Sequence, residues 1–237
     1  MKVILDGVFN HCGSFNKWLD REGFYAASGE YAPGAYQSKE SPYRNFFKFR
    51  NENDKNSYEG WWGYETLPKL NFEESEELCE YICRVGAKWV SAPYNVDGWR
   101  LDVADELPDC FIKQIRCAVK RNGGVLYGEV WEDASNKVSY GEQRAFLYGE
   151  ELDSVMNYPF LNAIHSFVKG GSGVSFMQEV LTICENYPKE TIDCLMNLLS
   201  THDTERVLTA LAGEESLSRG REWQAVRGAC EKRPPRH

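Results

Sequence analysis

Three acidic residues each follow a short apolar run of the sequence and stand in a distinct motif. Asp102 lies in GWRLDVADE, Glu129 in YGEVWED and Asp203 in STHDTER. Side chains at the carboxyl ends of parallel strands converge on one rim of a barrel or a doubly wound sheet. We therefore expect these three carboxylates to surround one pocket, where a pair of them would suit acid–base and nucleophilic work of the glycosidase type.

The neighbours of the carboxylates indicate different roles. Arg100 and Asp102 are two residues apart on a predicted strand, so they point the same way, and the positive charge favours the ionised Asp102. Asp102 is then suited to attack. Glu129, between Tyr127 and Trp131, would face that anion, so we expect a raised pKa, as a proton donor near neutral pH requires.

The sequence leaves the stereochemistry open. Retention requires carboxyl groups about 5 to 5.5 Å apart, whereas inversion requires roughly 6.5 to 9.5 Å. We expect His11, His202 and Asp203 to hold sugar hydroxyls as the ring flattens. Taken singly, each residue also fits a structural role, because acidic residues cap helices and most lone histidines are structural.

Strand-like and helical runs alternate along the chain and would bring these residues together. The apolar patterns predict strands at 2–11, 96–103, 125–131, 152–160 and 196–203, and helices at 73–90, 105–121, 163–169 and 175–186. This alternation predicts a parallel sheet with right-handed crossovers.

Residues 20–66 differ from the rest of the chain, because they contain no Val, Ile, Leu or Met but twelve aromatic residues. Such a segment cannot form ordinary amphipathic helices. We expect a loop-rich excursion in which most rings form a small core and about a quarter face a cleft, where rings can stack on sugars.

Composition narrows the class of partner. The net charge of -9 and pI near 5.1 argue against nucleic acid, whose binders present clustered basic charge. No apolar run approaches the roughly 20 residues that cross a bilayer, and the N-terminus lacks a secretory signal pattern, so we expect no membrane partner and a cytoplasmic location. A neutral, polyhydroxyl partner fits better.

Taken in order, the motifs resemble the signature regions of the α-amylase superfamily. Residues 6–11 (DGVFNH) resemble its first region, and GWRLDVADE, GEVWED and STHDTER resemble the second, third and fourth. Residues 67–71 (LPKLN) resemble the fifth-region variant of the neopullulanase, cyclomaltodextrinase and maltogenic amylase group. The resemblance implies Asp102 as nucleophile, Glu129 as acid/base and Asp203 as transition-state stabiliser. It implies substrate-binding roles for a further set: Asp6, Asn10, His11, Arg100, Glu106, Trp131 and His202.

The resemblance also implies an architecture. The fold would be α/β, a partial (β/α)8 TIM barrel of about strands three to seven, formed by residues 1–11 and 72–213. Residues 12–71 would be the family's domain B, and residues 214–237 an irregular tail. Strands one, two and eight would be absent, so we expect a fragment that is poorly stable, prone to associate and weakly active or inactive by itself.

For function, the resemblance implies hydrolysis of α-glucosidic bonds in cyclodextrins, pullulan, maltodextrins or starch by retaining double displacement. A transglycosylase or debranching relative, and a silent glucan-binding protein, remain alternatives. Asp105 replaces the subgroup's usual asparagine, which leaves bond specificity open. The chemistry needs no cofactor. A structural calcium ion stays open, because Asn10 and domain B supply ligands in many relatives but no compact D-x-D-x-N loop is present. Full-length relatives often dimerise.

Overall fold

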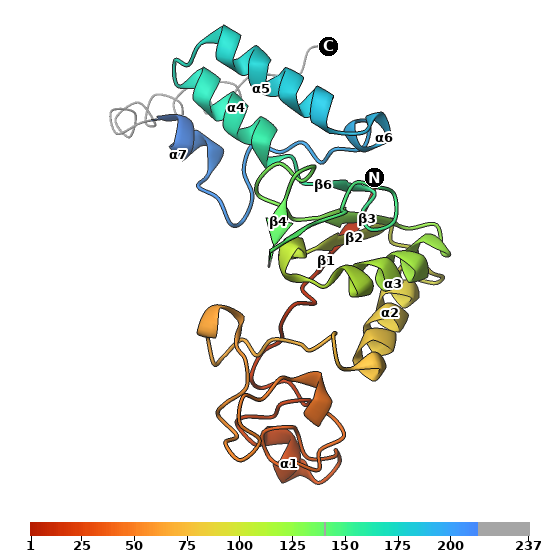
Figure 1. Cartoon of the computed structure of the whole chain (residues 1–237). Helices are drawn as coiled ribbons and strands as arrows, with labels where there is room; N and C mark the ends of the chain where they lie inside the picture. The colour runs from red at the N-terminus through yellow and green to blue at the C-terminus, as the bar shows by residue number, and fades with distance from the viewer. Residues whose placement is uncertain (140, 213–237) are drawn as a thin grey trace, which may run out of the picture. The chain divides into compact units, whose positions relative to one another are not determined.

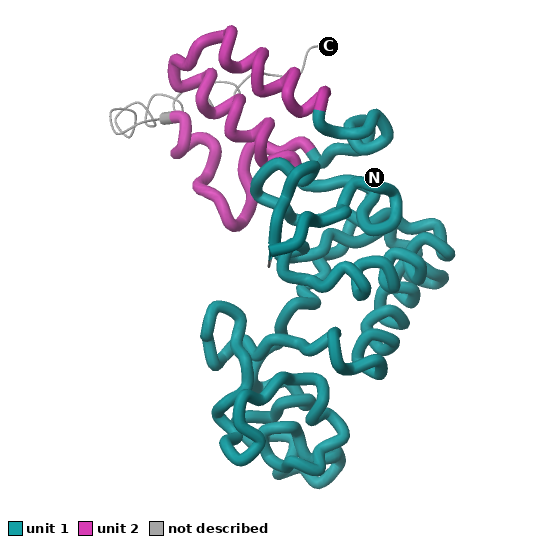
Figure 2. The backbone as a smooth tube through the Cα atoms, viewed as in Figure 1, with its two compact units in different colours: residues 1–156, 186–196 teal, residues 157–185, 197–237 magenta. Residues whose placement is uncertain are grey.

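The computed structural model describes residues 1–139 and 141–212. Its backbone divides into two compact units, shown in Figure 2: residues 1–156 with 186–196, and residues 157–185 with the part from 197 onward. The limits of these two units differ from the limits of the three domains that the sequence predicts. The predicted division into domains stays a prediction.

A parallel sheet forms the centre of the first unit. Its four strands follow the order β1 (Ile4–Gly7), β2 (Gly98–Leu101), β3 (Val125–Gly128) and β6 (Ser154–Val155), and all neighbours are parallel. Met196 adds one parallel bridge to Met156, beside β6. The register places Asp6 opposite Arg100 and Arg100 opposite Tyr127. The predicted parallel sheet is therefore confirmed, with strands shorter than expected.

Two amphipathic helices connect these strands and pack against each other (Figure 1). Helix α2 (Glu76–Val90) begins at Ser75, whose hydroxyl accepts from the Leu78 amide, as N-cap residues do. Helix α3 (Asp109–Lys120) buries four side chains at helical spacing: Phe111, Ile112, Ile115 and Val119. Burial of this stripe contributes about 1.5 to 3 kcal/mol for each large side chain. The predicted helix at 105–121 therefore starts later, after the 3-10 turn η3 (Ala104–Glu106).

Residues 12–71 are loop-rich, as expected, with only short elements: α1 (Phe24–Ser28), η1 (Arg44–Phe46) and η2 (Trp61–Gly63). The prediction that most of their rings are core is wrong. Of the twelve aromatic residues between 20 and 66, only Phe46, Phe47 and Tyr58 are buried. The segment lacks aliphatic side chains to cover rings, so its stability depends on edge-to-face ring pairs and cation–π contacts.

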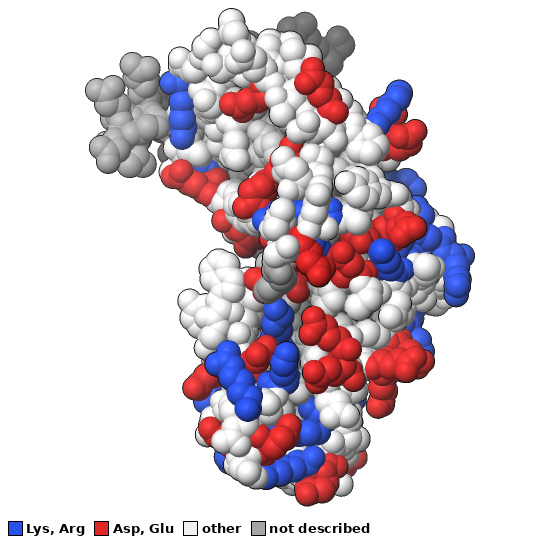
Figure 3. Space-filling model, viewed as in Figure 1, with Lys and Arg blue, Asp and Glu red and all other residues white. Residues whose placement is uncertain are grey.

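The first unit is completed by a hairpin of β4 (Val138–Ser139) and β5 (Glu142–Gln143) and by α6 (Lys189–Ile192). Acidic and basic side chains are interspersed on the face of this unit that Figure 3 shows. No described helix has the length and apolar character that a membrane span needs.

The second unit is helical and contains α4 (Tyr158–Val168), most of α5 (Gly173–Asn186) and α7 (Val207–Ala212). Two predicted strands are corrected here. The run at 152–160 is a strand only at 154–155, because Asn157 caps α4 by accepting from the Phe160 amide. The run at 196–203 has one bridge, at Met196, and then forms bends and turns.

Candidate active site

A buried guanidinium joins three of the predicted site residues at the carboxyl end of the sheet. The Arg100 Nη1 atom lies 2.7 Å from Asp6 Oδ1 and 2.7 Å from Asp102 Oδ1, while Nη2 lies 2.8 Å from Glu129 Oε1. Strands β1, β2 and β3 each supply or immediately precede one of these acids. The predicted same-side placement of Arg100 and Asp102 is confirmed by this contact.

The backbone after β2 and β3 fixes where the two predicted catalytic carboxylates lie. The Asp102 amide donates to the Gly7 carbonyl at 3.2 Å, and the Glu129 amide donates to the Leu101 carbonyl at 2.9 Å. Val103 then adopts a left-handed conformation, with φ of 39°, which is unusual for a β-branched residue. In this conformation its amide donates to Glu129 Oε2 at 2.8 Å.

The charges in this cluster depend on one another. The Arg100 and Glu129 side chains are 7% and 3% exposed, so neither could be left unpaired without a large desolvation penalty. Burial alone would lower the pKa of Arg100, but the hydrogen bond to Asp6 and the charges of Glu129 and Asp6 raise it. Arg100 therefore stays positively charged among the three carboxylates. The raised pKa expected for Glu129 stays a prediction.

A second group of residues surrounds Glu106 and includes one further predicted residue, His11. Its Oε1 atom accepts from Trp61 Nε1 at 3.1 Å and from Trp62 Nε1 at 3.0 Å, and Lys69 Nζ lies 3.4 Å from Oε2. His11 stacks on Trp61 with ring centroids 4.7 Å apart. Burial lowers the pKa of His11, while the charges of Asp102 and Glu106 raise it in part.

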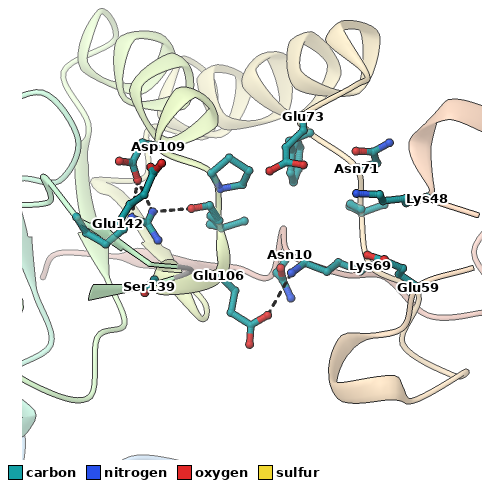
Figure 4. A pocket seen from close by; sticks show the side chains of 15 residues that line it. Asn10, Lys48, Glu59, Lys69, Asn71, Glu73, Glu106, Asp109, Ser139 and Glu142 are labelled. Atoms are coloured by element: carbon teal, nitrogen blue, oxygen red, sulfur yellow. Dashed lines mark hydrogen bonds and ion pairs between the residues drawn. The ribbon is translucent and has the colours of Figure 1, made fainter. Parts of the chain in front are cut away.

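A polar cavity of about 410 Å³ lies next to this second group. Figure 4 shows its walls: Lys48, Glu59, Lys69, Asn71 and Glu73 on one side, and Glu106, Asp109, Ser139 and Glu142 on the other. Asn10, which is 1% exposed, also lines it. Asp102 and Glu129 do not, so the cavity adjoins the carboxylate cluster and does not contain it.

Of the remaining predicted residues, one follows β3 and two belong to the second unit. Trp131, three residues after β3, is 42% exposed. His202 and Asp203 belong to the second unit, where His202 Nε2 lies 3.1 Å from Asp203 Oδ2 and both side chains are exposed. The convergence of Asp203 with Asp102 and Glu129 therefore stays a prediction.

The described residues contain no group of three or more His, Cys, Asp or Glu side chains placed to hold a metal ion. A calcium ion would need such oxygen ligands, six to eight in all. Asn10, the ligand that the resemblance suggests, has its amide nitrogen 3.4 Å from His11 Nδ1. The calcium ion stays an open expectation.

Sequence reasoning missed four contributors to the site. The sequence does not distinguish Trp61 and Trp62 from the other rings of residues 20–66, although the pair lies only a few residues before the LPKLN motif. Lys69, within that motif, pairs with Glu106. Arg144 gave no signal, yet its buried guanidinium donates to the carbonyls of Asp105 and Leu107, just after Asp102.

Comparison with known proteins identifies the family of the chain. A family model described as "Alpha amylase, catalytic domain" matches residues 1–227. The chain belongs to the alpha-amylase family. It is 34% identical to neopullulanase 2 of Thermoactinomyces vulgaris over 92% of its length. It is 32% identical to a cyclomaltodextrinase of Geobacillus thermopakistaniensis over 90% of its length. The predicted resemblance to this group of alpha-amylase relatives is confirmed.

Solved structures of the family show the same fold. The cyclic α-maltosyl-(1→6)-maltose hydrolase of Arthrobacter globiformis aligns with a TM-score of 0.73 and 26% identity, over 90% of this chain and 45% of that one. A cyclomaltodextrinase aligns with a TM-score of 0.72 and 30% identity, over 90% and 34%. With the parallel order of β1, β2, β3 and β6, these matches confirm the predicted α/β fold, a partial (β/α)8 barrel.

The chain spans about a third of the neopullulanase and the cyclomaltodextrinase, at 35% and 34% of their lengths. It spans 17% of an amylopullulanase from Thermoanaerobacter thermohydrosulfuricus, to which it is 31% identical.

Proposed function

We propose that this chain is the catalytic core of a glycoside hydrolase that cleaves α-glucosidic bonds of α-glucans with retention of configuration. The observation that supports this most strongly is the shared guanidinium of Arg100, which holds the Asp102 and Glu129 carboxylates side by side on neighbouring nitrogens. A double displacement requires two carboxyl groups about 5 to 5.5 Å apart that flank the bond to be cleaved.

In the first step, an Asp102 carboxylate oxygen attacks the anomeric carbon while the bond from that carbon to the leaving oxygen breaks. Glu129 donates its proton to the leaving oxygen, which departs as a hydroxyl. In the second step, Glu129 removes a proton from water, the water oxygen attacks the anomeric carbon, and the ester bond to Asp102 breaks. Two inversions give net retention. Asp203 is proposed to stabilise the oxocarbenium-like state, as the family resemblance implies.

The ion pair between Arg100 and Glu129 fits the second step. Glu129 Oε1 forms an ion pair with Arg100 Nη2 and Glu129 Oε2 accepts from the Val103 amide, and both contacts favour the carboxylate form. We infer that this arrangement corresponds to Glu129 as the base. Protonation of Glu129 for the first step would weaken its contact with Arg100 and leave Asp102 as the ionised partner.

The test uses purified protein carrying this chain, with β-cyclodextrin, pullulan and maltoheptaose as substrates, since relatives are named cyclomaltodextrinase, neopullulanase and amylopullulanase. Asp102→Asn should lower kcat about a thousandfold or more, because no nucleophile replaces the carboxylate. Asp193→Asn is the matched control, because Asp193 is an exposed acid that pairs only locally, with Lys189. An unchanged rate in Asp102→Asn would refute the nucleophile.

The stereochemistry has its own readout. Proton NMR during the first minutes of maltoheptaose hydrolysis should show the α-anomer of the product before mutarotation. Initial release of the β-anomer would refute retention while leaving the hydrolase assignment in place.

A further inference from the structure

Three stacked rings lead outward from the carboxyl end of β1. His11 and Trp61 lie nearly parallel, with centroids 4.7 Å apart and planes at 9°. Trp61 and Trp62 follow, with centroids 5.2 Å apart and planes at 31°. His11 is half-buried, whereas Trp62 is 78% exposed. The row therefore runs from the carboxyl end of β1, the strand that supplies Asp6, to a solvent-facing indole.

Trp62 is held in a backbone conformation that large side chains avoid. Its φ of 50° and ψ of 25° lie in the left-handed region, inside η2. Here the Trp61 amide donates to the Leu67 carbonyl at 2.8 Å and the Gly63 amide to the Gly60 carbonyl at 2.9 Å. Strain of this kind persists only where the surroundings impose it, and it concentrates at ligand-binding sites.

Glu106 fixes the orientation of both indoles. One of its oxygens accepts both indole N–H groups, and Lys69 pairs with the other oxygen. Because the polar edge of the Trp62 ring is already hydrogen-bonded, its exposed part is an apolar face. The turn η2 projects from the loop-rich segment in Figure 1, and the surface over it in Figure 3 is uncharged.

We propose that the face of Trp62 is a sugar-stacking surface for an α-glucan unit beyond the cleaved bond, and that Glu106 orients it. A pyranose ring presents a face of C–H groups with hydroxyls at its edge. The C–H groups complement the negative face of an indole, while the hydroxyls stay hydrated. This inference rests on the proposed function, because it takes the α-glucan as the ligand.

The test is calorimetric titration with maltohexaose of the Asp102→Asn protein, which does not consume the ligand. Adding Trp62→Gly removes the ring and also relieves the left-handed strain, so the melting temperature should not fall. Adding Trp62→Phe keeps a flat ring but loses the bond to Glu106. Trp89→Ala is the control, because Trp89 is a partly exposed tryptophan on α2 that stacks on Tyr94.

We expect Trp62→Gly to weaken maltohexaose binding about fivefold, within the range of measured aromatic-pair energies, with Trp62→Phe intermediate and Trp89→Ala unchanged. In protein with an intact Asp102, the same change should raise KM with little change in kcat. Binding by Trp62→Gly as tight as that of its parent, or no binding by the parent, would overturn the inference.

The two proposals fail separately. If the Trp62→Gly variant hydrolyses the substrate with an unchanged KM, only the proposed stacking surface is refuted. If the protein with an intact Asp102 does not hydrolyse the substrates, but maltohexaose binding still depends on Trp62, only the proposed function is refuted.

Discussion

Glu151 is a buried carboxyl group that the proposed chemistry does not use. Its side chain is 0% exposed, and neither carboxyl oxygen has a hydrogen-bond partner in the described part of the chain. Lys113 Nζ is 3.9 Å from Oε1 and is itself shared with Glu150. Burial, with the nearby charge of Asp109, raises the pKa of Glu151 from 4.5 to about 7. We predict that Glu151→Gln stabilises the protein above neutral pH.

The magnitude and its pH window follow from this pKa. Between pH 4.5 and about 7 the folded state holds a proton that the unfolded state has lost, so stability falls as the pH rises. At roughly 1.4 kcal/mol for each pH unit, the loss is complete near pH 7 and amounts to about 3 kcal/mol. Glutamine has the same size and no charge. The advantage of Glu151→Gln should therefore grow from near zero at pH 4.5 to about 3 kcal/mol at pH 8.

The assay is urea unfolding followed by tryptophan fluorescence at several pH values from 4.5 to 8. The difference between the variant and the parent is the quantity to plot, because the contributions of the other titrating groups cancel in the difference. Glu150→Gln is the control, because it removes the same charge from a side chain that is 74% exposed. A pH-independent difference for Glu151→Gln would refute the reasoning, as would an equal effect of Glu150→Gln.

Two further predictions concern the scaffold of the first unit. Arg144→Met should lower the free energy of unfolding by about 3 kcal/mol, because it strips buried carbonyls in segment 105–107 of charged donors; an unchanged urea midpoint would contradict this. Gly98→Ala should cost about 3 kcal/mol, because its Cβ would lie 2.1 Å from the Val125 carbonyl oxygen. Gly173→Ala meets only ordinary contacts, so thermal melting should show no loss for that control.

The sheet was predictable because its strands are short apolar runs with a simple period. The alternation in residues 96–103 placed Arg100 and Asp102 on one side, and their contact at 2.7 Å confirms it. The start of α4, the helix after β6, could also have been predicted from the sequence. Asn157 followed by Tyr158 and Pro159 is an N-cap with proline in the first turn, and it outweighed the apolar run that suggested a strand.

Cross-strand partners were harder to predict, because register is set by hydrogen bonds between strands and leaves little trace in local sequence. Nothing in GWRLDVADE indicates that Arg100 also reaches Asp6 on β1 and Glu129 after β3. The burial of rings in residues 20–66 was unpredictable for a related reason. A ring is covered only by neighbours that the fold brings to it, and a segment without aliphatic residues has few to offer.

The Arg100 cluster explains why the separate motifs must be considered together. One guanidinium serves three carboxylates, so the cluster carries excess negative charge and each acid depends on the others for its share of Arg100. Removing any one of the three acids would strengthen the interaction of Arg100 with the other two. The electrostatics of the predicted nucleophile and acid/base are therefore a property of the first three strands of the sheet as a unit, and a motif on a single strand cannot set them.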